Sequence, residues 1–321
     1  MSVAIITGIT GQVGSFLAKH LLSLGYDIIG VDKFAYNTAN LDFHGITDSI
    51  KLYPGDITNK IEMTELIRHF KPTEIYNLGA VADSPTAWDT PIYVSEVNAL
   101  GVSKLLEAIV ATDKSIKFFQ ATSSEIFGKA TESPQNETTR FCPRGPYAVA
   151  KAFGFEITAS YREYYNLFAV SGILFNNESE IRPRKFVTRK ITSSVAEIKS
   201  GFKKKLFLGN LESKKDWGFC GDYVRAIHMM LQQEDPTDYV IGSGKAHSVV
   251  QFCEKAFSHA GLDYKDYVEV NMDFYRPTDA VTLVADPTLA NKQLGWFPEV
   301  SFDELVERMV DYDLKLLEDK K

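Results

Sequence analysis

Cysteine is scarce in this sequence, and long apolar runs are missing from it. The three cysteines among 321 residues are Cys142, Cys220 and Cys253, which are dispersed and form no C-x-x-C pair. Such thiols are typical of a reducing compartment, and their spacing indicates neither a disulfide framework nor a metal motif. No apolar stretch approaches the roughly 18 residues that span a membrane, and the N-terminus leads directly into a strand-like segment rather than a signal peptide. We therefore expect a cytoplasmic protein without a metal site.

Positive charge is also in deficit. Lysine and arginine number 35 against 42 acidic residues, which gives a formal net charge of −7. Binding to a phosphate backbone depends on a clustered positive field, so this balance argues against a nucleic-acid-binding protein. The remaining composition, 45% hydrophobic and 24% charged, is that of a globular chain whose length allows one large domain or two modest ones.

What is present is an alternation of short strand-like segments with helical patterns. The segment 3–7 is continuously apolar and β-branched, as expected of a strand covered on both faces. Such alternation predicts a Rossmann-type α/β fold with a doubly wound, mostly parallel sheet. We expect residues 1–175 to form this domain and residues 176–321 to form mainly a smaller C-terminal substrate-binding lobe, from which some strands return to the first domain. Further predicted strands lie at 28–31, 74–78, 116–121 and 169–174, and predicted helices near 16–24, 60–70, 94–111, 186–200, 221–233 and 248–260.

A glycine-rich turn follows the first predicted strand. The stretch TGITGQVG at 7–14 lies directly between a strand and a helix. Glycines allow a tight turn and a close approach of the backbone to a pyrophosphate, and the helix start presents free N–H groups and a positive dipole end to that anion. In this context the pattern predicts a dinucleotide site. The residues assigned to it are Gly8, Thr10, Gly11, Gln12, Val13 and Gly14.

Asp32 indicates which dinucleotide is bound. It follows the second predicted strand, eighteen residues after Gly14, where a carboxylate accepts hydrogen bonds from the ribose hydroxyls of adenosine. The same charge would repel a 2′-phosphate, so we expect NAD rather than NADP, although neighbouring Lys33 softens the discrimination. The remaining residues assigned to the cofactor are Asp56 and Ile57, which follow Tyr53-Pro54-Gly55, and Leu78 and Ala80, at and beyond the end of the predicted strand 74–78.

A tyrosine and a lysine form a candidate catalytic pair. Tyr147 has Lys151 four residues later, on a helix that Pro143 and Pro146 introduce, and positions i and i+4 share one helix face. A lysine cation together with an oxidised nicotinamide would lower the pKa of the tyrosine from about 10 toward the working range. Tyr147 is therefore a candidate general base toward a sugar hydroxyl, and both residues also belong to the predicted cofactor site.

A hydroxyl and a carboxylate follow the strand at 116–121. In open α/β sheets, ligands bind beyond the carboxyl ends of the strands, so the hydroxyl of Ser123 can hydrogen-bond a reacting oxygen there. Glu125 is a second potential acid or base at the same edge. Capping of a turn is the alternative role for Ser123 and Ser124.

These motifs resemble those of the extended short-chain dehydrogenase/reductase superfamily and, within it, the GDP-mannose 4,6-dehydratases. The similarity runs over most of the chain. The glycine-rich turn and the Tyr147–Lys151 stretch are shared widely in the superfamily, whereas FVTRKI at 186–191 and GNLESKKDWG at 209–218 are more specific to the dehydratases. Other matching stretches are KPTEIYNLGA, FFQATSSEIFG, ETTRFCPRGPYAVAK, LFAVSGILFNNES and YRPTD.

The resemblance implies roles for individual residues. Ser123, Glu125, Tyr147 and Lys151 match the catalytic residues of the family. Lys215 stands where the family usually has arginine, which keeps the charge but loses the bidentate fork. The positions implied to bind the sugar nucleotide are Ser84, Asn176, Val187, Lys190, Gly209, Lys215 and Arg276.

The implied reaction removes water from a GDP-hexose, with GDP-mannose as the first choice. Tyr147 takes the proton of the C4 hydroxyl while hydride leaves C4 for the nicotinamide, and the resulting ketone acidifies the C5 hydrogen, which Glu125 removes. Water leaves from C6, hydride returns there, and the product is a 4-keto-6-deoxy sugar nucleotide. The resemblance also implies a homodimer or homotetramer, and we expect no nucleic-acid or membrane partner.

Three stretches depart from the family. Members usually carry basic residues in place of Asp32-Lys33-Phe34 and use NADP, so NADP is the alternative to the NAD that Asp32 favours. The loop 82–88 lacks a histidine and a serine–phenylalanine that the family places near the sugar, so a GDP-heptose or a GDP-N-acetylhexosamine is the alternative substrate. Ile181-Arg182 stands for paired arginines that reach a neighbouring subunit's cofactor.

Two other functions use the same motifs. A nucleotide-sugar epimerase or 4-keto reductase would need the tyrosine–lysine pair and the cofactor, but neither requires a base for C5 deprotonation coupled to water loss, so Glu125 favours the dehydratase. A non-catalytic dinucleotide sensor would have no need for Tyr147, Lys151 and Glu125 together, so their presence in one chain favours an enzyme.

Overall fold

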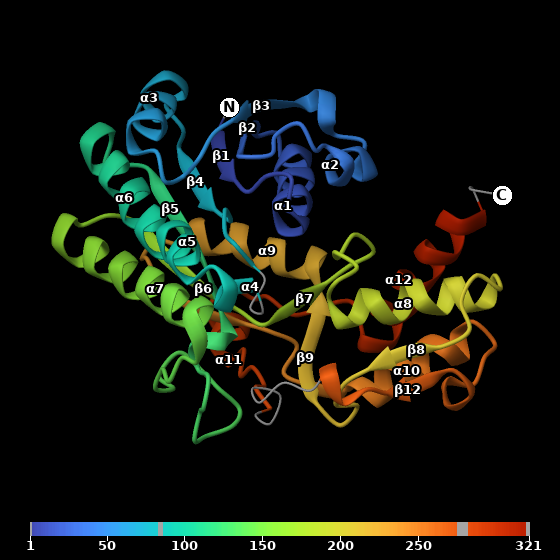
Figure 1. Ribbon diagram of the computed structural model, residues 1–321. Coiled ribbons are helices and arrows are strands. Elements are labelled where there is room, and N and C mark those ends of the chain that lie inside the picture. The colour runs from blue at the N-terminus through green and yellow to red at the C-terminus, as the bar shows by residue number, and fades with distance from the viewer. Residues whose placement is uncertain (1, 83–85, 275–281, 319–321) are drawn as a thin grey trace.

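A seven-stranded parallel sheet is the central element of the computed structural model, which describes residues 2–82, 86–274 and 282–318 (Figure 1). The strand order is β10-β6-β5-β4-β1-β2-β3, and all neighbours run parallel. Because the order reverses between β1 and β4, this is a doubly wound Rossmann-type sheet with its switch point there. The predicted fold class is confirmed. The strands are β1 Val3–Thr7, β2 Asp27–Asp32, β3 Ile50–Pro54, β4 Glu74–Asn77, β5 Lys117–Ser123, β6 Ala169–Leu174 and β10 Tyr239–Ile241.

The central strands are buried on both faces. Consecutive strand residues point to opposite sides of a sheet, so Ile5 and Ile6 of β1 belong to two different hydrophobic cores. Phe118 and Phe119 of β5 divide between the cores in the same way. This double coverage is the reason that the segment 3–7 is continuously apolar rather than alternating.

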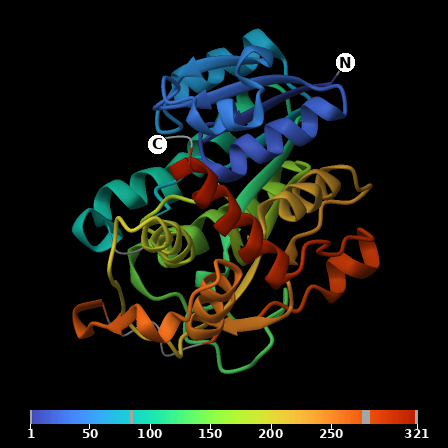
Figure 2. The same cartoon turned by 90° about the vertical axis from the view of Figure 1, so that its right-hand side faces the viewer.

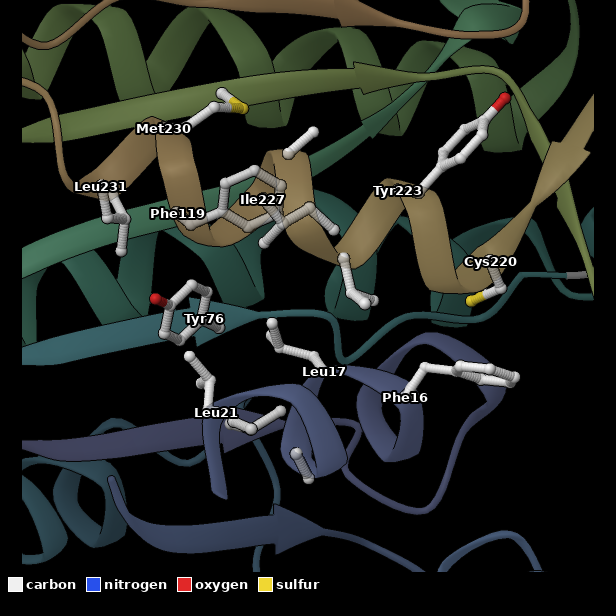
Figure 3. Packing of buried hydrophobic residues seen from close by; sticks show 14 of the residues in the cluster. Phe16, Leu17, Leu21, Tyr76, Phe119, Cys220, Tyr223, Ile227, Met230 and Leu231 are labelled. Atoms are coloured by element: carbon white, nitrogen blue, oxygen red, sulfur yellow. The ribbon is translucent and has the colours of Figure 1, made fainter. Parts of the chain in front are cut away.

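Helices form the two outer layers. In the first core, Leu17 and Leu21 of α1 face Ile227 and Met230 of α9, with Phe119 beside them (Figure 3). The second core joins α3, α6 and α7 to the opposite face of the sheet (Figure 1). Each leucine-sized side chain buried here contributes roughly 2 kcal/mol, so the two layers hold the carboxyl ends of the strands in fixed positions. The helices are α1 Gln12–Ser23, α3 Lys60–Phe70, α6 Gly101–Thr112, α7 Gly145–Tyr165 and α9 Cys220–Leu231.

Two details of this domain differ from the sequence-based expectation. The helix expected near 94–111 is divided into α5 (Pro91–Ser95), a π-helical turn (Glu96–Leu100) and α6, and in the π turn the Asn98 carboxamide bonds the N–H and carbonyl of Val81 at 2.8 and 3.0 Å. A π turn contains about one residue more than an α-helical turn, and the pattern of apolar residues in the sequence does not reveal this difference. Strand β3 was not expected, because its stretch is short and ends in proline, as edge strands often do.

The rest of the chain builds a second, smaller group of layers (Figure 2). A three-stranded sheet has the order β11-β9-β7, a parallel pair joins β8 to β12, and one core packs them with α8, α10 and α12. These elements are β7 Asn176–Glu178, α8 Val187–Lys199, β8 Leu206–Leu208, β9 Lys214–Phe219, β11 Ala246–Ser248, α10 Val249–His259, β12 Val268–Val270 and α12 Phe302–Glu318; the short helices α2 Ala39–His44, α4 Thr86–Asp89 and α11 Thr288–Gln293 lie elsewhere.

The two halves of the sequence interleave. From the second half, β10 pairs with β6, and α9 packs against α1 on the large sheet. A division at residue 175 stays a prediction, and we propose that α9 and β10 belong with the first domain. Within the described ranges, every helix is too short or too polar to serve as a transmembrane span.

Candidate active site

The glycine-rich turn is closed by backbone contacts that exclude side chains. Gly8 has φ +68°, and a Cβ on it would lie 2.8 Å from the Leu78 carbonyl oxygen. A Cβ on Gly14 would lie 2.3 Å from the Gly8 oxygen. The Gly8 N–H donates to Val31 O at 2.9 Å and the Gly11 N–H to Gly8 O at 3.0 Å. Backbone therefore packs on backbone here, as a site for a closely approaching pyrophosphate requires.

Helix α1 begins directly behind this turn. Gly11 is its N-cap and supplies no side-chain cap. Gln12, Val13 and Gly14 occupy the first helical positions, where N–H groups have no carbonyl partner within a helix. Their N–H groups and the dipole of this twelve-residue helix favour an anion at the carboxyl end of β1.

Asp32 lies beside the turn, at the end of β2. Its Oδ2 accepts hydrogen bonds from Thr10 N at 3.2 Å and Thr10 Oγ1 at 2.8 Å, and its Oδ1 accepts one from Phe34 N at 2.9 Å. The carboxylate is thus fixed at the strand end where a ribose would lie. Lys33 points to another partner, because its ammonium is 3.0 Å from Asp56 Oδ2.

The other residues assigned to the cofactor lie at the same edge of the sheet. Asp56 follows β3, and its Oδ1 accepts from Thr58 N at 2.9 Å. Leu78 follows β4, and its N–H donates to Thr7 Oγ1 at 3.2 Å. The Ile57 side chain is buried in the second core. Ala80 lies one residue beyond Gly79, on the segment that leaves β4.

The structure brings three of the predicted catalytic residues together at the end of β5. The Tyr147 hydroxyl hydrogen-bonds the Ser123 side chain, and Ser123 Oγ also accepts from Glu125 N at 3.3 Å. Burial, and then the nearby Glu125 carboxylate, raise the pKa of Tyr147 above its ordinary value, against the opposing effects of the Ser123 hydrogen bond and of Arg182. Ser123 therefore both caps the turn at 124–126 and contacts the tyrosine, so its two predicted roles coexist.

Lys151 is the fourth member, one helical turn beyond Tyr147 on α7. Its Nζ donates to the Ala121 carbonyl oxygen at 2.9 Å and lies 6.0 Å from the centre of the Tyr147 ring. Burial lowers the pKa of Lys151 to about 8. The polypeptide alone thus shifts the pKa of Tyr147 upward, whereas the sequence predicted a downward shift from the lysine with an oxidised nicotinamide. A positive charge within the site would have to supply that shift.

The positions implied to bind the sugar nucleotide lie on the second group of layers. Asn176 begins β7 and donates to Asp216 O at 3.3 Å, and Val187 begins α8. Lys190 Nζ donates to Phe207 O at 2.8 Å, and a Cβ on Gly209 would lie 2.5 Å from Phe274 O. Lys215 lies on β9, two residues before the position that pairs with Asn176. Ser84 and Arg276 lie outside the described residues.

Sequence reasoning overlooked a buried polar group next to this face. Glu178 ends β7 and is almost fully buried, accepting from Thr188 Oγ1 at 2.6 Å. Arg182 Nε lies 3.1 Å from Glu178 Oε2, and its guanidinium covers the Phe186 ring at 3.6 Å. Arg182 therefore has partners within its own chain, and the contact with a neighbouring subunit's cofactor that the resemblance implied stays a prediction. The signal available in the sequence was an acidic residue, Glu178, within LFAVSGILFNNES, a stretch that matches the family.

Fold and site together define a class of protein. A doubly wound sheet, a glycine turn at its switch point, and a serine, a tyrosine and a lysine at the end of β5 are the features of the extended short-chain dehydrogenases/reductases.

The comparison with protein families identifies the branch. The model described as GDP-mannose 4,6 dehydratase matches residues 5–309, and the chain belongs to this family.

Curated relatives carry the same designation. GDP-mannose 4,6 dehydratase 2 of Arabidopsis thaliana is 44% identical over 331 aligned residues, covering 99% of this chain and 88% of the relative. The human GDP-mannose 4,6 dehydratase is 43% identical, covering 98% and 92%. The Vibrio cholerae enzyme is 41% identical, covering 98% and 94%.

Solved structures share the fold. The dTDP-glucose 4,6-dehydratase of Bacillus anthracis, solved in complex with NAD, superposes with a TM-score of 0.87 at 23% identity, covering 99% of this chain and 98% of its own. The UDP-glucose 4-epimerase of Thermotoga maritima, with UDP-glucose, gives 0.86 at 23% identity, covering 98% and 99%. At this identity the likeness concerns the fold alone.

Proposed function

We propose that this chain is a nucleotide-sugar 4,6-dehydratase that converts GDP-mannose to its 4-keto-6-deoxy derivative. Family membership supports the reaction class. The observation that carries the proposal is the convergence of Tyr147 with Glu125 on Ser123, whose side chain bonds Tyr147 and accepts from Glu125 N at 3.3 Å. One site then holds a hydroxyl base and a second, separate proton acceptor.

The dinucleotide site fits a nicotinamide cofactor. Gly8 and Gly14 have no room for a Cβ, the start of α1 favours a pyrophosphate, and Asp32 lies where the adenosine ribose would be. When bound, the nicotinamide group supplies a reversible hydride acceptor, so that oxidation at C4 and reduction at C6 cancel within one turnover. We propose NAD rather than NADP, since the Asp32 charge opposes a 2′-phosphate and the Asp56 carboxylate pairs with neighbouring Lys33.

Tyr147 handles the first proton. Its oxygen accepts the proton of the C4 hydroxyl while the C4–H bond breaks as hydride, which leaves a C4 ketone. The Ser123 hydroxyl, already bonded to Tyr147, can hydrogen-bond the same substrate oxygen. Lys151 is held by its hydrogen bond to Ala121 O, and while it is protonated its positive charge near Tyr147 favours the deprotonated tyrosine.

Glu125 handles the second proton. The C4 ketone acidifies the C5 hydrogen, and the exposed Glu125 carboxylate accepts that proton. The C6–O bond then breaks, the hydroxyl takes the proton that Glu125 holds and leaves as water, and C5 takes the proton that Tyr147 holds when hydride arrives at C6. An epimerase or a 4-keto reductase has no step at C5 with loss of water, so the position of Glu125 beside Tyr147 favours the dehydratase.

The sugar nucleotide would lie along β7, β9 and the start of α8. Val187 N–H, at the first position of the thirteen-residue α8, and the Lys215 cation are suited to the diphosphate. Lys190 of α8 is bonded to Phe207 O of β8 and covers the Phe274 ring at 4.1 Å, and we propose that it borders the same site, as predicted. We propose that Asn176 and Gly209 border the same site, as predicted.

Mass spectrometry of GDP-mannose incubated with the protein tests the function. We expect the loss of one water, and we expect Glu125→Gln to reduce the bound dinucleotide without releasing water. A mass that stays unchanged with GDP-mannose, a GDP-heptose and a GDP-N-acetylhexosamine would contradict the dehydratase. An isomer of unchanged mass would indicate an epimerase, and a gain of two hydrogens a reductase. Full dehydration by Glu125→Gln would remove Glu125 from its role.

The surface of α5 and α7 supports a homodimer. Ile92 of α5 is 85% exposed, and Val149 and Phe153 of α7 are 54% and 41% exposed. The two helices are adjacent, and positions 149 and 153 share a face (Figure 1). A second copy presenting the same face would cover these side chains across a twofold axis. Light scattering should give twice the chain mass, and the Val149→Asp, Phe153→Asp variant should give a monomer. A monomeric wild type would contradict the dimer.

We propose a cytoplasmic location. All three cysteines are free thiols, and Cys220 and Cys253 are buried. This usage fits a reducing compartment. Fractionation of expressing cells, with a periplasmic or secreted marker as reference, tests the location.

A further inference from the structure

Gln12 serves both halves of the proposed site. Its backbone N–H lies at the start of α1, where the pyrophosphate is expected, but its side chain turns away from that position. Gln12 Nε2 donates to Asn177 O at 3.0 Å and to Asn177 Oδ1 at 2.9 Å. Gln12 Oε1 accepts from Ser179 Oγ at 2.8 Å. The carboxamide therefore joins the dinucleotide turn to β7, about 165 residues away in sequence.

This junction is buried and leaves little freedom. Gln12 is 7% exposed and Ser179 is fully buried. Both amide hydrogens and the carbonyl oxygen have partners, and a buried polar network that is fully bonded fixes one arrangement. Ser179 is itself held in a turn, since its carbonyl oxygen accepts from Arg182 N at 3.1 Å.

The junction extends from β7 to the predicted contacts of the sugar nucleotide. Asn176 precedes the bonded Asn177, and the next residue, Glu178, bonds Thr188 in the first turn of α8. Asn177 pairs with Gly218 of β9, two positions from Asp216 and three from Lys215. A shift of Gln12 would therefore move the strand that carries one ligand relative to the turn that carries the other.

We infer that Gln12 is a positioning residue that sets the distance between the dinucleotide and the sugar nucleotide. This rests on the proposed function. Hydride transfer requires the reacting atoms about 3–3.5 Å apart, and a displacement of 1 Å can cost roughly 100-fold in rate. The same link couples the two binding sites, so that each ligand strengthens the binding of the other.

The test replaces the hydrogen-bonding carboxamide by an apolar group of similar length, Gln12→Met. We expect kcat to fall about 100-fold while the KM for GDP-mannose changes less than about threefold. In the wild type, saturating GDP should tighten NAD binding at least about fivefold, measured by titration calorimetry, and in Gln12→Met this factor should fall below about two. Gln135→Met is the matched control, because Gln135 is also buried and its carboxamide joins Glu132 O to Val284 N rather than the glycine turn to β7.

The outcomes separate the inference from the proposed function. Ser179→Ala removes one bond of the junction without touching the glycine turn; it should show a smaller loss of coupling, and adding it to Gln12→Met should cost little more. Unchanged coupling in Gln12→Met, equal loss in Gln135→Met, or no coupling in the wild type would each overturn the inference. These binding measurements need no turnover, so a protein that fails to dehydrate GDP-mannose still gives an answer on Gln12.

Discussion

The dinucleotide turn and the sugar-nucleotide face are built on opposite principles. The turn is one run, residues 8–14, whose shape is set by backbone packing on backbone at Gly8 and Gly14. The face collects Asn176, Val187 and Lys215 from three separate elements, and their positions depend on how small sheets pack with α8. A site formed by the backbone therefore consists of consecutive residues, whereas a site formed by side chains consists of residues that only folding brings together.

The catalytic group combines both principles. Tyr147 and Lys151 are neighbours through the helix repeat, as their spacing indicates. Their proton affinities, however, are set by the surroundings: burial lowers the pKa of Lys151 to about 8 and raises that of Tyr147. The spacing of two residues predicts contact, but the direction of a pKa shift depends on every group around them.

The largest effect should come from Tyr147→Phe, which removes a side-chain function and leaves the backbone-built turn intact. We expect kcat to fall about 10³-fold, since no oxygen remains to accept the C4 proton, while NAD affinity stays within about twofold. Single-turnover rates and calorimetric titration measure the two quantities. Tyr164→Phe, an exposed change at the far end of the same helix, is the control. A comparable loss in the control, or a kcat within tenfold of the wild type, would contradict the assignment.

Gly14→Ala should damage the backbone-built glycine turn and leave the catalytic side chains in place. Its Cβ would lie 2.3 Å from Gly8 O and 2.8 Å from Ile9 Cα, and backbone atoms yield little. Overpacking of this kind costs about 1–3 kcal/mol, so we expect roughly ten- to hundredfold weaker NAD binding. Gly11→Ala, whose Cβ would meet Gly8 O at 3.1 Å, should lose less. GDP binding to the dinucleotide-free protein should fall less than NAD binding in both; equal losses would show that the two regions are not built separately.

This contrast explains what the sequence could and could not predict. The Rossmann sheet, the glycine turn, and the group of Ser123, Tyr147 and Lys151 follow from local patterns at strand ends. The π turn around Asn98 and the ion pair of Glu178 with Arg182 do not. Asn98 bonds Val81, seventeen residues away, and the ion pair, although local, depends on the burial that the fold gives to Glu178. The Gln12 side chain belongs to the second kind: its position in the motif is predictable, but its bond to Asn177 is not.

Lys151→Met should change stability in a pH-dependent way. Burial lowers the pKa of Lys151 from 10.5 to about 8, so between about pH 8 and 10.5 the unfolded chain binds a proton that the folded chain lacks. The wild type must then gain stability as pH rises through this window, and below it the burial of the cation costs at most about 3 kcal/mol. The Lys151→Met variant lacks this pH dependence of its free energy of unfolding. At pH 7 it avoids the cost of burying the cation but loses the bond to Ala121 O, which contributes about 1 kcal/mol, so it should be more stable than the wild type by the difference. Urea unfolding at pH 7 and 9.5 measures the difference; parallel curves for the two proteins would contradict the shift.

The smallest effect should come from Asp32→Asn, which tests whether the turn needs one side chain to choose its ligand. Asparagine keeps an acceptor for the Thr10 donors and removes the charge that opposes a 2′-phosphate. Loss of about 1 kcal/mol of charge repulsion should raise NADP affinity relative to NAD about fivefold. Asp48→Asn, an exposed change in the same domain, is the control. If the ratio of the two dissociation constants is the same in Asp32→Asn and in the wild type, the backbone of the turn sets the preference by itself, and the ribose assignment of Asp32 is wrong.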